Sequence, residues 1–149
     1  MKILYFLLLS SFLTFSCTHE SVADAFVFTT YGCYCVGNCI SGYKLTETGL
    51  FKGEGNKCDP SNLSFEKSPL STDKLALGQA LRNAFPAELL DSPEDTYGCP
   101  DCGDWGGHYI EWTENGTTRT WNLDALTDNL SGDVKIFVEA LQQTMRDLQ

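Results

Sequence analysis

The chain has 149 residues, 42% of them hydrophobic and 20% charged, and its 20 acidic against 10 basic residues give a formal net charge of −10. Such an acidic chain repels nucleic acid and anionic lipid headgroups, so we expect no nucleic-acid partner and contact with a membrane only through an N-terminal lipid anchor. The length suits one domain with one hydrophobic core. It leaves no room for a second domain.

Residues 1–16 are typical of a signal peptide, because Lys2 precedes an apolar run over residues 3–15 that is too short to cross a bilayer. Residues 13–17 resemble a bacterial lipoprotein box, in which a small residue precedes a cysteine that receives the lipid. We therefore expect lipidation at Cys17, a flexible tether over 17–24 and a single globular domain over 25–149. Cleavage after Ala25, at an A-x-A pattern, is the alternative. Both routes place the protein in the bacterial cell envelope, held on a membrane by lipid, or periplasmic or secreted.

Six cysteines remain once Cys17 is set aside. An even number in an exported chain predicts up to three disulfides, with fifteen possible connectivities that the sequence does not distinguish. The six are Cys33, Cys35, Cys39, Cys58, Cys99 and Cys102.

Two chemical alternatives compete with this structural role. A redox centre needs Cys-x-x-Cys at the start of a helix, but Cys99 and Cys102 are followed by a glycine-rich stretch that does not favour one. Zinc could be held by four thiolates, since the spacing of the two cysteine pairs is one that zinc tolerates. That candidate zinc site consists of Cys35, Cys39, Cys99 and Cys102. An oxidising compartment disfavours it, and the expected cofactor is none.

The first half of the chain predicts three strands and a helix. Residues 25–31 alternate in the manner of a strand, and residues 42–55 predict a hairpin that turns near Thr48 and Gly49. After a loop rich in Pro, Ser and Asn, a helix is expected to end at Pro86. Its expected core face consists of Leu77, Ala80, Leu81, Ala84 and Phe85.

The second half predicts a hairpin and a terminal helix. Asn115-Gly116 suits a type I′ turn between two alternating runs, and the register then opposes Trp112 with Arg119 and His108 with Leu123. The face that carries the aromatic residues should be buried, with Arg119 over Trp112. That face carries His108, Ile110, Trp112, Arg119, Trp121 and Leu123.

The terminal helix should run from about Asp133 to Leu148, with Ser131 as its N-cap, and should cover the aromatic face of the sheet. Its apolar stripe comprises Val134, Phe137, Val138, Leu141, Met145 and Leu148. The resulting architecture is of the α+β class: an antiparallel sheet of about five strands, packed by two helices, with disulfide-braced loops.

Candidate functional residues are few. His108 has no second histidine or nucleophile signature near it, so we interpret it as structural and predict no catalytic residue. Asp101, Asp104 and Glu111 lack the spacing of a calcium loop, so no metal is expected there. Trp105, between glycines, either plugs the edge of the core, which the sequence favours, or anchors a partner as tryptophans at interface hot spots do.

Three stretches resemble small uncharacterised bacterial lipoprotein domains: residues 32–46, residues 98–112 and the terminal helix. The order of elements has a looser similarity to emfourin-type metalloprotease inhibitors. These resemblances carry no activity over to this chain. Export, disulfide-braced loops and the lack of a catalytic constellation in the sequence predict a non-enzymatic binding or inhibitory module of the envelope, with an unknown envelope or secreted protein as its partner. The alternatives are a thiol/disulfide or zinc-binding protein that uses Cys99 and Cys102, and a purely structural envelope protein.

Overall fold

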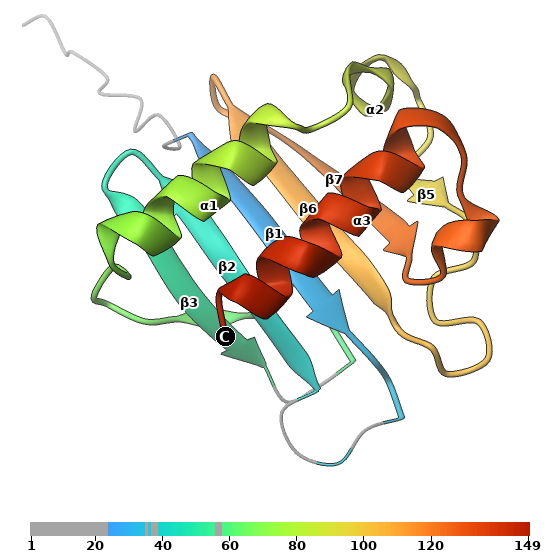
Figure 1. Cartoon of the computed structure of the whole chain (residues 1–149), viewed down its shortest axis with the longest axis horizontal. Coiled ribbons are helices and arrows are strands. Elements are labelled where there is room, and N and C mark those ends of the chain that lie inside the picture. Colours follow the sequence, from blue (N-terminus) through green and yellow to red (C-terminus); the bar gives the residue numbers. More distant parts are fainter. Residues whose placement is uncertain (1–23, 35, 37–38, 56–57) are drawn as a thin grey trace, which may run out of the picture.

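The computed structural model describes residues 24–34, 36, 39–55 and 58–149. They form a seven-stranded sheet in the order β4-β3-β2-β1-β6-β7-β5, with α1 and α3 lying across one face (Figure 1). The strands are β1 (Ala25–Tyr31), β2 (Ile40–Thr46), β3 (Gly49–Gly55), β4 (Ser64–Phe65), β5 (Thr96–Tyr97), β6 (Gly107–Glu114) and β7 (Thr117–Asp124). The helices are α1 (Thr72–Asn83), α2 (Ala87–Asp91), a 3₁₀ turn η1 (Thr127–Asn129) and α3 (Gly132–Asp147).

The α+β class is confirmed. The five long strands form the expected antiparallel sheet, and two strands of two residues each are added at its edges. One of them, β5, pairs with β7 in parallel, so the whole sheet is mixed. Such short edge strands limit the backbone that the sheet offers for pairing with another chain.

The hairpin of β6 and β7 has the predicted register. His108 lies opposite Leu123, and Trp112 lies opposite Arg119. Asn115 and Gly116 have φ angles of 52° and 75°, as a type I′ turn requires. Because this turn fixes the pairing, it also fixes which side chains face the helices.

The main core lies between this face of the sheet and the helices, as predicted. Phe26 and Phe28 of β1 and Tyr43 of β2 are buried there beside Trp121 of β7. The whole predicted stripe of α3 is buried against them. Its residues are Val134, Phe137, Val138, Leu141, Met145 and Leu148.

The predicted face of α1 is partly wrong. Leu81 is buried and Leu77 and Phe85 are partly buried, but Ala80 and Ala84 are exposed. The helix instead approaches β3 through Gly78, where an added Cβ would lie 3.0 Å from a methyl carbon of Leu50. A glycine has no hydrophobic signal in a sequence pattern, yet here it marks a close contact between the helix and the sheet.

Two smaller predictions on this face also need correction. Ser131 occupies the N-cap position of α3, but within the described part of the chain its side chain makes no capping hydrogen bond. The Val134 amide donates instead to Glu88 Oε1 of α2, at 3.1 Å. The guanidinium over Trp112 belongs to Arg82 of α1, while Arg119 lies 4.9 Å from the Trp121 ring centroid and donates to the carbonyls of Leu90 and Ser92.

The opposite face of the sheet carries a second, smaller cluster. Tyr31, Ile40 and Tyr109 are buried there, with Cys33, Cys39 and Leu63 partly buried beside them. Among the residues that the structure describes, none of the helices is both long and apolar enough to span a membrane. The predicted signal peptide and Cys17 lie outside the described residues, and so does most of the tether over 17–24.

Candidate functional site

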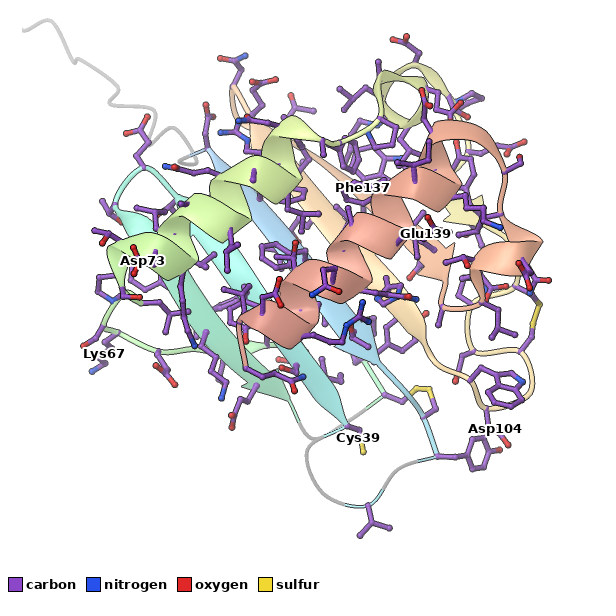
Figure 2. All side chains as sticks on the ribbon, in the orientation of Figure 1. Cys39, Lys67, Asp73, Asp104, Phe137 and Glu139 are labelled. Atoms are coloured by element: carbon purple, nitrogen blue, oxygen red, sulfur yellow. A yellow bond between two sulfur atoms is a disulfide. The ribbon has the colours of Figure 1, made fainter. Side chains whose placement is uncertain are left out.

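The candidate site lies where two loops leave the same end of the sheet. Tyr31, the last residue of β1, pairs with Gly107, the first residue of β6. The loop after β1 (residues 32–39) and the loop before β6 (residues 98–106) therefore start side by side, and a Cβ on Gly32 would be 4.0 Å from the Gly106 Cα. We call them the paired loops. Figure 2 shows Cys39 and Asp104 at this end of the molecule.

The loop over 98–106 is a tight structure closed on itself. Cys99 and Cys102 form a disulfide, with their Cα atoms 5.4 Å apart. The Asp101 amide donates to the Gly106 carbonyl at 2.8 Å, and the Gly106 amide donates to Asp101 Oδ1 at 3.1 Å. Positive φ angles at five positions turn the chain back on itself. These positions are Gly98, Asp101, Gly103, Asp104 and Gly106.

Asp124, at the end of β7, fixes this loop to the sheet. Its Oδ2 accepts hydrogen bonds from the Cys99 amide at 2.8 Å and from Asn129 Nδ2 at 2.7 Å, and its Oδ1 accepts one from the Leu126 amide. Burial raises the pKa of this carboxyl, but the hydrogen bonds outweigh burial and lower the pKa overall. Asp124 was not among the residues predicted from the sequence. The signal that could have revealed it is local, because an aspartate two residues before a loop amide is typical of an Asx turn.

A second disulfide joins the loop after β1 to the segment before β4. Cys33 and Cys58 are bonded, with Cα atoms 4.9 Å apart, and their sulfurs lie within 4.8 Å of an Asp101 carboxylate oxygen. Cys39 is also disulfide-bonded. Cys35 lies outside the described residues. The prediction that cysteines brace the loops is therefore confirmed for the described residues, and the two disulfides meet at Asp101.

The two chemical alternatives, a zinc site and a redox centre, both depend on the state of these cysteines. A zinc site made of Cys35, Cys39, Cys99 and Cys102 needs thiolates, whereas Cys99 and Cys102 are bonded to each other and Cys39 is disulfide-bonded. A redox Cys-x-x-Cys gains its reactivity at a helix N-terminus. Here a turn follows Cys102 and then strand β6 begins. The remaining acidic candidates are spread out, since Asp104 is exposed in the loop and Glu111 accepts a hydrogen bond from Tyr109 on β6.

Trp105 projects from the closed loop into solvent. The prediction that it plugs the core is wrong, because 67% of its surface is exposed. The indole lies back over Gly103, where an added Cβ would be 3.2 Å from the ring nitrogen Nε1. Tyr34, on the neighbouring loop, is 82% exposed, and Val36 is fully exposed. The paired loops thus present three large apolar side chains on a braced frame.

His108 is a structural residue at the floor of a neighbouring cleft of about 390 Å³. It is 2% exposed, and burial is the main cause that lowers its pKa to about 4. The Gln142 amide nitrogen can only donate, so the ring Nε2, 3.3 Å away, is the acceptor. The proton of the neutral ring then sits on Nδ1, 3.1 Å from the Thr30 hydroxyl. Both ring nitrogens are engaged in holding α3 and β1 to the end of β6.

Comparison with known proteins adds no family to this description. No protein-family model matches the chain, and no curated protein matches it either. The site must therefore be interpreted from its own geometry.

Proposed function

We propose that the protein is an exported, lipid-anchored, non-enzymatic binding or inhibitory module of the bacterial cell envelope. The observation that carries this proposal is the exposure of Trp105 on a loop closed by the Cys99–Cys102 disulfide. Tryptophan dominates the binding energy of many protein interfaces. A loop that is already ordered loses little entropy when it binds, so an exposed indole on a braced loop suits recognition.

The disulfides support the compartment. Disulfides in small domains are typical of oxidising, extracytoplasmic compartments, and two pairs are formed among the described residues. The lipid anchor at Cys17 is supported by the sequence alone. Cys17→Ala should move the protein from the membrane fraction to the soluble fraction of the envelope, or leave its signal peptide uncleaved. A variant that is processed and stays on the membrane would contradict the anchor.

The binding role is tested by covalent cross-linking of the full chain in its own envelope. Wild type should cross-link to a distinct protein, and Trp105→Ala should weaken the recovery of this partner about thirtyfold, as the loss of a hot-spot side chain does. Ile136→Ala is the matched control, since Ile136 is 64% exposed on α3 against 67% for Trp105. If Trp105→Ala recovers the same proteins as wild type, the paired loops are not the binding surface.

Thiol/disulfide exchange is the second candidate function, because Cys99 and Cys102 are both exposed. In such a step, Cys99 and Cys102 as free thiols would give two electrons and two protons to a partner disulfide, which would become a dithiol, and they would be left as their own disulfide. Alkylation of the exported protein without prior reduction distinguishes the two functions. Cysteines that react only after reduction favour the binding module, whereas free thiols at Cys99 and Cys102 favour exchange.

A further inference from the structure

We propose that the partner surface presents a cationic side chain, of arginine or lysine, flanked by apolar residues, and that the paired loops receive it at Trp105 and Asp104. This inference rests on the proposed function and specifies its partner. The exposed rings of Trp105 and Tyr34 define the surface. The distribution of charge around them defines what can bind there.

The chain has no lysine or arginine between Arg82 and Arg119, a stretch that contains the whole loop over 98–106. The same stretch carries eight carboxylates. They are Glu88, Asp91, Glu94, Asp95, Asp101, Asp104, Glu111 and Glu114. These do not form one patch, since Glu114 lies at the far end of β6 from the loop, and the acidic residues of the loop itself are Asp101 and Asp104. Negative charge on a loop without lysine or arginine favours cationic partners over anionic ones.

Several of these carboxylates are available to a partner. The two ion pairs among the described residues, Lys52 with Glu54 and Lys135 with Asp128, involve none of the eight. Within the part of the chain that the structure describes, the carboxylates of Glu94 and Asp104 make no hydrogen bond either. Asp104 directly precedes Trp105 in the loop, and both side chains are exposed to solvent.

A groove of about 490 Å³ begins where this loop leaves β5. Gly98, the first residue of the loop, lines it together with Tyr97, Leu130 and two carboxylates, those of Glu88 and Glu94. The Glu88 carboxylate is already engaged by the Val134 amide, whereas that of Glu94 is not. No basic residue lines the groove. The groove therefore extends the acidic and apolar surface of the loop toward the N-terminus of α3.

Tryptophan beside a carboxylate suits a cation well. An indole face attracts a guanidinium or ammonium group, and tryptophan does so best among the aromatic residues. Asp104 can complete the contact by an ion pair, and arginine can stack and form a bidentate hydrogen bond at once. A neutral glycan could stack on Trp105 and donate hydroxyl hydrogen bonds to a carboxylate, but unlike a cation it would gain nothing from the negative charge. The observations therefore favour a cationic protein segment.

A pair of synthetic peptides tests this inference with the full mature chain. In one blocked peptide arginine alternates with leucine, and in its twin neutral citrulline replaces every arginine. Titration is followed by tryptophan emission and by NMR, because Trp105 is exposed while Trp121 is buried. The arginine peptide should bind at least about fivefold more tightly at low salt than the citrulline peptide, and added salt should reduce that difference.

Three variants assign the contact. Asp104→Asn should remove most of the preference for arginine, and Trp105→Ala should abolish binding of both peptides. Glu139→Gln, which changes an exposed carboxylate on α3 (Figure 2), should change nothing.

Each other outcome overturns the cationic partner. If both peptides bind equally through Trp105, the recognition surface stands and the cationic inference fails. If neither peptide binds, the cationic inference fails while the cross-linking experiment still judges the proposed function. Binding of a glycan array through Trp105 without peptide binding would assign the surface to sugars instead.

Discussion

The helix-covered core and the paired loops are held in place by different means. In the core, Phe26, Phe28 and Trp121 are fully buried. Each core side chain is held in place by apolar surface that it buries together with many neighbours. In the loops, position depends on single atoms: two disulfides, the Asp124 carboxylate and a few positive φ angles. A change in the core should therefore mainly lower the free energy of unfolding. A change in the loops should mainly alter the positions of the loop side chains.

The largest expected effect is on the core side of this comparison. Phe137 is 1% exposed and packs edge-on against Phe85, with ring centroids 5.1 Å apart. Phe137→Ala should lower the free energy of unfolding by about 3–5 kcal/mol, measured by urea denaturation. Ile136→Ala, its exposed neighbour on α3, should stay within about 0.5 kcal/mol of wild type. Equal losses in the two variants would contradict the assignment of the buried stripe.

His108 lies where the two regions meet, and it should make stability depend on pH. Its pKa falls from 6.5 to about 4 on folding, mainly through burial, although the Asp124 carboxylate acts in the opposite direction. The unfolded chain therefore binds a proton more readily between these values. Stability from this group is complete above pH 6.5, falls by about 3 kcal/mol as the pH drops toward 4, and changes no further below that.

A variant that lacks His108 tests this pH dependence. His108→Gln should show a smaller loss of stability than wild type between pH 6.5 and 4, measured by urea denaturation at each pH. His19 and the carboxylates are present in both proteins, so the comparison isolates His108 together with its interaction with Asp124. Identical pH curves for the two proteins would show that His108 is not held neutral.

The core could be predicted from the sequence because its pattern is local. Asn115-Gly116 fixes the register of β6 and β7, and the period of two then assigns every side chain of both strands to a face. The stripe of α3 follows in the same way from the period of a helix. The predicted face of α1 was partly wrong because the helix also packs on the sheet through Gly78. When a helix face is predicted from the spacing of apolar residues, glycine is not counted.

The site could be predicted only in part, because its contacts join distant segments. The number of cysteines predicted disulfides, but the Cys33–Cys58 pair depends on how the sheet brings two loops together. Asp124 reaches the Cys99 amide across 25 residues of sequence. For Trp105 the sequence favoured a plug at the edge of the core over a partner anchor, without a local signal that decides between the two. The indole stays outside because the loop closes on itself through Asp101 and Gly106.

Two glycines have the same positive φ but different surroundings. Substituting each of them separates the cost of the φ angle from the cost of a steric collision between the loops. Gly106 and Gly116 both have φ of 75°, but an added Cβ meets nothing within 4 Å at Gly116 and collides with the Tyr31 carbonyl oxygen at Gly106. Gly116→Ala should cost about 1 kcal/mol of strain. Gly106→Ala should cost roughly 1–3 kcal/mol more, because the paired loops must separate.

The site should also respond to only one of the two glycine substitutions. Gly106→Ala should shift the emission of Trp105, while Gly116→Ala should leave it unchanged. Denaturation and fluorescence measure the two effects separately. Equal stability losses, with no spectral change, would mean that the loops do not depend on their close approach.

The smallest expected effect concerns a hydroxyl that the core does not satisfy. Tyr43 is fully buried, and its hydroxyl has no hydrogen-bond partner among the residues that the structure describes. Burial removes a polar group from water, and without a hydrogen-bond partner nothing compensates this loss of hydration. Tyr43→Phe should therefore stabilise the protein by up to about 1 kcal/mol in thermal or urea denaturation.

Tyr109→Phe is the matched control on the other face of the sheet. The Tyr109 hydroxyl donates to Glu111 Oε2 at 3.2 Å, so removing it should destabilise the protein by up to about 1 kcal/mol. The two substitutions delete the same atom from two buried tyrosines. The test is whether the free energy of unfolding rises for Tyr43→Phe and falls for Tyr109→Phe. If both variants lose stability, the Tyr43 hydroxyl contributes through packing, and the core depends on single atoms as the paired loops do.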